Sequence, residues 1–334
     1  MRTMKNDKPF LLKPAVKDYL WGGSRLNDDF GKEIDVTPLA ETWECSTHPD
    51  GLSMIATGKY AGKTLAEVLQ ECPQYLGTHP LQTMGGKAEL PMLIKLIDAK
   101  QSLSVQVHPD DEFALLHEHS LGKTEMWYVL AAKKDAKLIY GFNQNMNEGR
   151  VKEVLRTGNI EKYLNHVFVY KDDLFYIEAG TVHALGEGII VAEIQESSNL
   201  TYRLYDYNRL DKKGKQRELH VEKALQVMKM QSSAKPRQPM RVLHYRRGCA
   251  GELLTRCKYF QVERLLLNTE VYRNLVDYRT DNNSFHALLC TDGCGVMLGE
   301  DFTLNFFKGD CIFVPAASMP LKLHGKAQLL DVCC

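Results

Sequence analysis

The amino-acid sequence predicts a mainly β protein, built as an antiparallel sandwich or barrel. Short β-branched and aromatic runs bounded by Gly, Pro, Asp or Asn recur along much of the chain, as in LIYGF at 138–142 and FKGDCIFVPA at 307–316. Many short strands separated by turn residues are typical of these architectures. Helical patterns are confined to a few segments, which indicates helical insertions in a β framework.

Four segments have helical patterning, and they lie at 64–72, 110–119, 148–167 and 218–229. The second follows Pro109, and its first turn holds the acidic residues Asp110, Asp111 and Glu112. Acidic side chains in a first turn favour a helix start, because they interact with the positive end of the helix dipole. We therefore interpret this acidic run as a helix start.

The length of 334 residues favours two domains, and the sequence offers one linker candidate between them. Residues 231–240 read QSSAKPRQPM, a polar stretch with two prolines, after which the pattern is almost wholly β. We expect domains at 1–235, with the helical segments, and at 236–334. LFYIEAGTVHAL at 174–185 also resembles CIFVPAASMPLKL at 311–323, which predicts a duplicated sandwich. Alignment of the two segments places His183 on Pro320, so we assign the chemistry to the first copy.

Composition excludes several classes of partner and location. Lys and Arg total 42 and Asp and Glu total 42, so we expect no nucleic-acid or membrane partner, and any bound anion must occupy a local site. The start of the chain shows no apolar signal core, and no stretch approaches the ~20 apolar residues of a spanning helix. We expect a cytoplasmic protein whose nine scattered cysteines are reduced thiols, with no metal site at Cys290 and Cys294 or at Cys333 and Cys334.

Three short segments concentrate the polar residues that chemistry could use. In LSVQVHPDD, strand alternation places Ser104, Gln106 and His108 on one face and the two valines on the other. In GKTEMWYVLAA, Lys123 and Glu125 precede a strongly β run, and in IEAGTVHALG, His183 follows a glycine turn.

Two histidines and a carboxylate from three strands could hold a divalent metal, because imidazole and carboxylate suit zinc and leave positions open for substrate. Gln106 could add a neutral oxygen. The alternative is that these histidines are hydrogen-bonded structural residues, which is the commoner role of a strand histidine.

These segments, together with DYLWGGSRL, AETWECSTHPDG and SNLTYRLYDYNR, resemble the type I mannose-6-phosphate isomerases in their shorter bacterial form. The resemblance spans roughly residues 9–230 in the same order. It implies two cupin-like jelly-roll domains and one zinc ion held by His108, Glu125 and His183, with Gln106 matching a further ligand. It also implies that Arg203 is the active-site arginine and that Ser104 and Lys123 bind the substrate phosphate.

The resemblance implies an aldose–ketose isomerase that interconverts mannose 6-phosphate and fructose 6-phosphate by proton transfer between C1 and C2. The charge that builds on the two substrate oxygens would be stabilised by zinc and by a fixed guanidinium. The partner would be a small phosphorylated sugar, and the chain a monomer or a weak homo-oligomer. The base stays open among Glu193, Glu196, Asp206, an unligated histidine and zinc-bound water.

Each predicted catalytic or binding role has a purely structural alternative. Arg203 could form a salt bridge with Asp206, Lys123 could be a solvated turn lysine, and Ser104 could be an ordinary strand residue. Lys95, a charge inside an apolar run, points into the cavity or lies on an edge strand. Glu44 and Arg209 are similarly ambiguous.

At the level of the whole protein, a non-catalytic sugar-binding or regulatory cupin is the alternative, and a metal-dependent oxygenase ranks lower because its site is usually histidine-rich.

Overall fold

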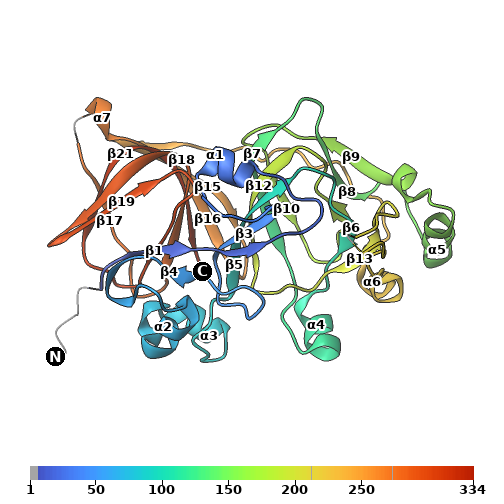
Figure 1. Cartoon of the computed structure of the whole chain (residues 1–334), viewed down its shortest axis with the longest axis horizontal. Coiled ribbons are helices and arrows are strands. Elements are labelled where there is room, and N and C mark those ends of the chain that lie inside the picture. The colour runs from blue at the N-terminus through green and yellow to red at the C-terminus, as the bar shows by residue number, and fades with distance from the viewer. Residues whose placement is uncertain (1–6, 212, 273) are drawn as a thin grey trace.

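The computed structural model describes residues 7–211, 213–272 and 274–334. Two β regions lie side by side, one formed mainly by the C-terminal strands and the other by strands of the middle of the chain (Figure 1). Strands dominate and helices lie at the periphery, so the prediction of a mainly β protein is confirmed.

A ten-stranded antiparallel sheet forms the C-terminal region. Its strands are β14 (His244–Arg246), β15 (Cys249–Arg256), β16 (Gln261–Asn268), β17 (Val276–Tyr278), β18 (His286–Gly299), β19 (Phe302–Phe307), β20 (Cys311–Val314), β21 (Leu321–Cys333), β1 (Phe10–Lys13) and β4 (Met54–Ile55). Strand β1 pairs with β20, with Phe10 opposite Phe313. The sheet therefore combines strands from both ends of the chain, and the division at residue 235 stays a prediction.

Two further sheets carry the segments singled out above. The six-stranded sheet has the order β10 (Leu174–Ile177), β7 (Glu125–Ala132), β12 (Ile189–Glu196), β5 (Met92–Ala99), β3 (Glu41–Cys45) and β2 (Ala15–Lys17). The five-stranded sheet has the order β13 (Tyr202–Tyr205), β6 (Val105–Val107), β11 (His183–Ala184), β8 (Lys137–Phe142) and β9 (Leu164–Phe168).

The six-stranded sheet is buried on both faces. Along β7, Met126 and Tyr128 join an apolar core that includes Phe313 and other residues of the ten-stranded sheet. The alternate residues Trp127 and Val129 join a second core that includes residues of β8 in the five-stranded sheet. Strand alternation thus gives one strand two apolar surfaces, and the first core joins the N-terminal and C-terminal segments.

The helices are α1 (Arg25–Phe30), α2 (Leu65–Glu71), α3 (Thr78–Thr83), α4 (Asp111–Glu118), α5 (Glu148–Arg156), α6 (Val221–Val227) and α7 (Thr269–Tyr272), with short 3-10 turns η1 (Gly58–Tyr60), η2 (Pro73–Tyr75) and η3 (Ile160–Tyr163). Helix α4 begins where expected, because the Asp110 side chain accepts a hydrogen bond from the Phe113 amide at 2.9 Å. In the described ranges, none of these helices has the length and apolar character needed to cross a membrane.

The predicted helix at 148–167 is wrong in its second half. Helix α5 ends at Arg156, and Gly158 follows with a positive φ of 67°, a conformation that stops a helix. After η3 the chain becomes β9, which pairs with β8. Helix α6 is likewise shorter than the expected 218–229, and residues 231–240 form no helix or strand. All nine cysteines are free thiols.

Candidate active site

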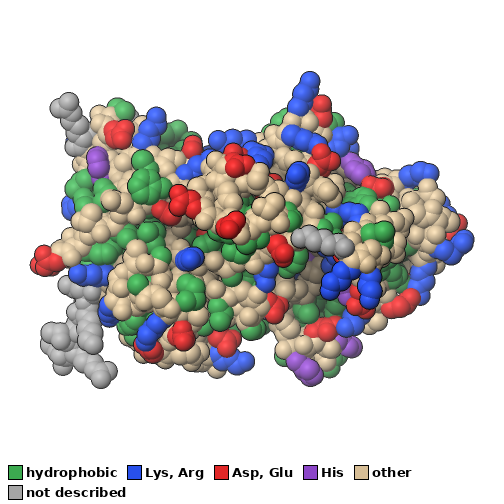
Figure 2. All heavy atoms as spheres, in the orientation of Figure 1, with side chains coloured by type: hydrophobic (Ala, Val, Ile, Leu, Met, Phe, Trp, Pro, Cys, Tyr) green, Lys and Arg blue, Asp and Glu red, His purple; other side chains and the backbone are tan. Residues whose placement is uncertain are grey.

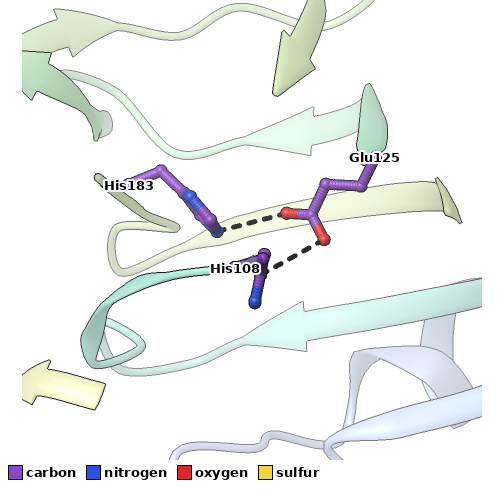
Figure 3. Close-up of side chains that lie close together, drawn as sticks. All are labelled: His108, Glu125 and His183. Atoms are coloured by element: carbon purple, nitrogen blue, oxygen red, sulfur yellow. Dashed lines mark ion pairs between the residues drawn. The ribbon is translucent and has the colours of Figure 1, made fainter. Parts of the chain in front are cut away.

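His108, Glu125 and His183 converge from three separate places in the two middle sheets (Figure 3). His183 Nε2 lies 3.2 Å from Glu125 Oε1, and His108 Nε2 lies 3.6 Å from Glu125 Oε2. The donor atoms of all three residues lie within 4.8 Å of one another, and the three side chains are buried. In the described part of the chain, this is the one cluster of three or more His, Cys, Asp or Glu side chains with metal-ligand spacing.

Local structure explains why these side chains face one another. Glu125 is the first residue of β7, and His108 directly follows β6. His183 opens the two-residue strand β11, where it pairs with Gln106 of β6 and Tyr140 of β8. The two valines of β6 pack in the apolar core on the opposite face, as the strand alternation predicted.

The cluster fits a divalent metal in both geometry and protonation. Zinc binds nitrogen and carboxylate donors at about 2.0–2.2 Å, so neighbouring tetrahedral donors lie roughly 3.4 Å apart, close to the observed 3.2 and 3.6 Å. His183 Nδ1 donates to the Thr181 carbonyl oxygen at 2.8 Å, which leaves the Nε2 lone pair toward Glu125. Among the residues that the structure describes, neither oxygen of the buried Glu125 carboxylate has a hydrogen-bond partner of good geometry.

The charges around the cluster favour the metal-binding protonation states. Burial and the neighbouring Lys123 ammonium lower the pKa of His108 well below its ordinary value. Burial alone would raise the pKa of Glu125, but the Lys123 ammonium in particular outweighs it and holds that pKa well below its usual range. A neutral imidazole and an ionised carboxylate are the forms that bind a metal.

Lys123 is part of this cluster, so the alternative of a solvated turn lysine is wrong. Its side chain is buried, and its Nζ lies 2.9 Å from Glu125 Oε2 and 3.2 Å from His108 Nε2. Gln106 lies on the other side, with its amide nitrogen 3.5 Å from His183 Nε2. Rotation of that amide by 180° would present the oxygen to the cluster instead, so ligation by Gln106 stays a prediction.

A cavity of about 250 Å³ lies beside the cluster and has a polar wall. Ser104, Gln106, Lys123 and Arg203 line it, so four of the predicted site residues share one cavity. Tyr19, Trp21, Glu41, Lys95, Ile97, Leu103, Glu193, Asn199, Thr201 and Arg217 complete the lining. On the molecular surface, Lys and Arg side chains gather over β13 and α6, next to this part of the fold (Figure 2).

The alternative of a salt bridge between Arg203 and Asp206 is wrong. Arg203 Nε donates to Ser104 Oγ at 3.3 Å, and its Nη1 donates to the Glu218 carbonyl oxygen at 2.7 Å. Asp206 instead pairs with Arg209 and with Arg217, whose Nη2 lies 2.6 Å away. The guanidinium of Arg203 therefore stays available to the cavity.

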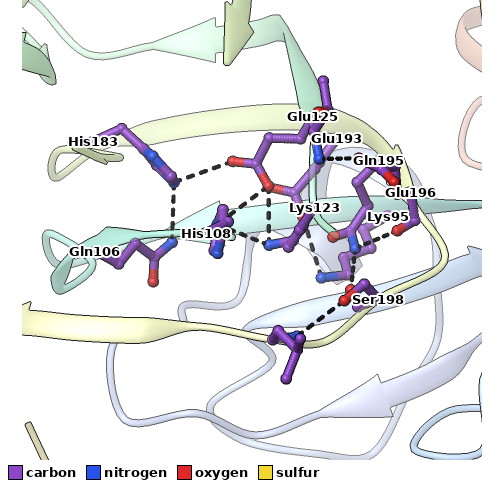
Figure 4. A network of polar contacts seen from close by, with 12 residues as sticks. Lys95, Gln106, His108, Lys123, Glu125, His183, Glu193, Gln195, Glu196 and Ser198 are labelled. Atoms are coloured by element: carbon purple, nitrogen blue, oxygen red, sulfur yellow. Dashed lines mark hydrogen bonds and ion pairs between the residues drawn. The ribbon is translucent and has the colours of Figure 1, made fainter. Parts of the chain in front are cut away.

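Lys95 points into the cavity, and the edge-strand alternative is wrong because β5 is an interior strand of its sheet. Its Nζ lies 3.1 Å from Glu193 Oε1 (Figure 4). The same Nζ lies 3.8 Å from Glu41 Oε2. Indole groups hold both carboxylates, since Trp43 Nε1 donates to Glu41 at 2.7 Å and Trp127 Nε1 donates to Glu193 at 2.8 Å.

The candidate bases differ in their access to the cavity. Glu193 lines it, whereas Glu196 and Asp206 are not among the lining residues. Burial, and then the Asp111 carboxylate, raise the pKa of Glu196 to about 8. Glu44 lies outside the cavity and forms a buried ion pair, with Lys32 Nζ 2.7 Å from Glu44 Oε1.

Sequence reasoning gave no role to Glu41, Trp43, Trp127 and Arg217. Glu41 and Trp43 lie within AETWECSTHPDG, one of the motifs that carry the family resemblance, so that motif offered a signal. Arg217 lies in a polar stretch with no periodicity, and the fold pairs it with Asp206 and places it in the cavity lining.

The mainly β fold, with a His/Glu/His cluster beside a polar cavity, defines the class of cupin-type proteins with a candidate metal site. A family model described as phosphomannose isomerase type I, catalytic domain, matches residues 10–136. Mannose-6-phosphate isomerase ManA of Bacillus subtilis (strain 168) is 36% identical over 329 residues, which cover 97% of this chain and 98% of that protein.

Solved structures agree with these matches. The crystal structure of the mannose 6-phosphate isomerase from Bacillus subtilis superposes with a TM-score of 0.87 at 32% identity, covering 98% of this chain and 99% of that one. A zinc-bound mannose 6-phosphate isomerase shares the fold, with a TM-score of 0.75 at 16% identity. The chain therefore belongs to the type I mannose-6-phosphate isomerase family, which confirms the predicted family, cupin-type fold and enzyme class.

Proposed function

We propose that this chain is a zinc-dependent isomerase that interconverts mannose 6-phosphate and fructose 6-phosphate. One observation carries the proposal: three buried ligand-type side chains meet beside a cavity that several cationic side chains line. The lining holds four cationic side chains, Lys95, Lys123, Arg203 and Arg217, against the two carboxylates of Glu41 and Glu193. Glu125 and Asp206 pair with Lys123 and Arg217 in turn, so a zinc ion at the cluster would add the two positive charges that complement a sugar phosphate, which carries about −1.5 to −2 charges near neutral pH.

Each group at the cavity then has a role in moving a proton between C1 and C2. Zinc held by His108, Glu125 and His183, with Gln106 as a further ligand, would supply Lewis-acid stabilisation of the charge on the substrate oxygens. Arg203 stabilises the same charge with a guanidinium that contacts Ser104 and the Glu218 carbonyl oxygen, while Asp206 pairs with Arg209 and Arg217.

We assign the proton transfer to Glu193. It is the carboxylate, among those considered from the sequence, that lines the cavity, and Trp127 and Lys95 hold its two oxygens in place. Ser104 and Lys123 both line the cavity, and Lys123 also contacts the ligand cluster, so the two side chains can bind the substrate phosphate there.

The domain organisation also stays a proposal, with a catalytic cupin-like unit at 1–235 and a second one at 236–334 that packs against it. A monomer or weak homo-oligomer in the cytoplasm, with a phosphorylated sugar as its partner, remains our expectation.

A coupled assay with mannose 6-phosphate and fructose 6-phosphate tests the proposal. Wild type should turn over both sugars, lose turnover in the presence of a chelator and regain it on addition of zinc. His183→Ala should be inactive, whereas His244→Ala, at an exposed histidine of β14, should match wild type. A wild type that binds zinc but turns over neither sugar would instead support the non-catalytic sugar-binding alternative.

A further inference from the structure

The segment 122–125, which ends at the predicted metal ligand of β7, is held through its backbone by two carboxylates. The Gly122 amide donates to Asp111 Oδ1 at 3.1 Å, and the Thr124 amide donates to Glu196 Oε1 at 2.6 Å. The Glu196 amide in turn donates to the Thr124 carbonyl oxygen at 3.0 Å. The placement of this segment therefore depends on where the two carboxylates are held.

Asp111 connects the segments of two predicted ligands. It follows His108 by three residues, and its carboxylate binds Gly122, which precedes Glu125 by three residues. This contact closes the excursion 112–121, which includes most of α4. Gly122 packs so tightly here that a Cβ would lie 2.5 Å from the Asp111 backbone nitrogen. The spacing between the two ligand segments is thus fixed at Asp111.

The second oxygen of Asp111 is bound by the C-terminal half of the chain. Tyr259 Oη donates to Asp111 Oδ2 at 2.7 Å, and Lys258 Nζ donates to the same oxygen at 2.9 Å. Both residues lie in the turn between β15 and β16, which the Cys257 amide closes with a 3.0 Å hydrogen bond to the Phe260 carbonyl oxygen. Phe260 is buried in the core shared with the six-stranded sheet, so the turn is anchored.

The protonation states agree with this arrangement. Burial raises the pKa of Asp111, but hydrogen bonds from Lys258, Tyr259 and the Gly122 amide outweigh burial and lower it to about 2. Asp111 is therefore an ionised acceptor that gathers several donors. Burial, and then the nearby Asp111 carboxylate, raise the pKa of Glu196 to about 8, and its Oε1 accepts the hydrogen bond from the Thr124 amide. The two carboxylates thus hold the segment 122–125 through two separate backbone amides.

We propose that Tyr259 is a positioning residue for the metal centre: through Asp111 it fixes the spacing of His108 and Glu125, so the C-terminal half sets the metal affinity. The inference rests on the proposed function, because it requires that the cluster bind a metal. Lys258 contributes less, since its side chain is 70% exposed and its ion pair is screened by water.

The test compares the zinc dissociation constants of wild type, Tyr259→Phe and Tyr278→Phe, measured with zinc alone by competition against a chromogenic chelator. Tyr278 is a matched control, because its hydroxyl donates to Asp331 at 2.9 Å within the C-terminal half. Groups that orient metal ligands change affinity by about 10–100-fold when mutated. We expect Tyr259→Phe to weaken zinc binding roughly tenfold, at the lower end of that range, and Tyr278→Phe to leave it unchanged.

The outcomes separate this inference from the proposed function. A wild type that binds no zinc contradicts the proposed function, whereas a Tyr259→Phe variant that binds zinc as tightly as wild type overturns only the positioning role. Equal weakening in Tyr278→Phe would also overturn it, because the effect would then be general destabilisation. Asp111→Asn serves as the second variant, and it should weaken zinc binding at least as much as Tyr259→Phe.

Discussion

Replacement of Lys123 by methionine should destabilise the metal-free protein and tighten its binding of zinc. The Lys123 ammonium lies 2.9 Å from Glu125 Oε2 and 3.2 Å from His108 Nε2, and all three side chains are buried. A divalent ion at the same donors competes with this ammonium. In the variant, the Glu125 carboxylate has lost the positive charge of Lys123. A bound zinc ion would supply a positive charge in its place.

The magnitude follows from the buried pair. At an effective dielectric constant of about 20, two unit charges at this separation of 2.9 Å attract each other by about 6 kcal/mol before desolvation is counted. Removal of one partner from a buried pair costs about 3–5 kcal/mol, because the other charge is left uncompensated. Zinc supplies the missing charge, so the variant regains this free energy on binding. At about 1.4 kcal/mol per factor of ten, 3 kcal/mol tightens the zinc dissociation constant roughly a hundredfold.

Urea unfolding of the metal-free proteins and a competition titration with zinc measure the two effects. Lys32→Met is the matched control, because it breaks a buried pair with Glu44 outside the cavity. This control should lose stability with an unchanged zinc affinity. The reasoning is refuted if Lys123→Met is as stable as wild type without metal, or if it binds zinc no more tightly.

Three further predictions concern other parts of the molecule. Gly122→Ala should weaken zinc binding and lower the free energy of unfolding by about 1–3 kcal/mol, because the new Cβ would lie 2.5 Å from the Asp110 backbone carbonyl carbon. Unchanged values in a zinc titration and a urea melt would contradict this prediction. Arg203→Lys should lower kcat in the coupled assay with little change in stability, because an ammonium keeps the charge without the planar fork, and an unaffected kcat would remove Arg203 from the mechanism. Burial opposes a charge on His286, but Asp331 at 2.6 Å outweighs burial and raises the pKa of His286. The pair therefore adds stability that is fully present below the unfolded pKa of about 6.5 and is lost as pH rises through the folded pKa. Urea melts should then show the deficit of Asp331→Asn shrinking from pH 5.5 to pH 9, and a constant deficit would rule the linkage out.

The sequence alone predicted the parts of the fold that depend on local patterns. The alternation of LSVQVHPDD placed Val105 and Val107 in the core and turned the neighbouring polar side chains to the opposite face. The acidic start of α4 was equally readable, because a helix cap uses residues that are close in the chain. The meeting of His108 with residues of β7 and β11 was not local: the residue types left a metal site and structural histidines as alternatives, and the family resemblance decided for the metal site.

The predictions failed where one residue or segment has several possible partners or conformations and the sequence does not show which one the fold adopts. Asp206 has three arginines within reach along the chain, and the fold gives it to Arg209 and Arg217 and leaves Arg203 free of it. The pairing of β1 with β20 joins residues about 300 positions apart, which no local pattern records. The segment after Gly158 has both helical and strand character, and pairing with β8 decides for the strand.

Strand register places the buried charges of the cavity. Lys95 of β5 lies opposite Trp43 on one side and Glu193 of β12 on the other, and Glu193 lies opposite Trp127 of β7. These four residues form one row across the six-stranded sheet, in which each acid or base has a partner on the neighbouring strand. A slip of one residue along β5 would turn Lys95 into the apolar core that now holds Ile94. An unpaired buried charge is costly, so the register that folds the sheet is also the register that presents Lys95 and Glu193 to the cavity.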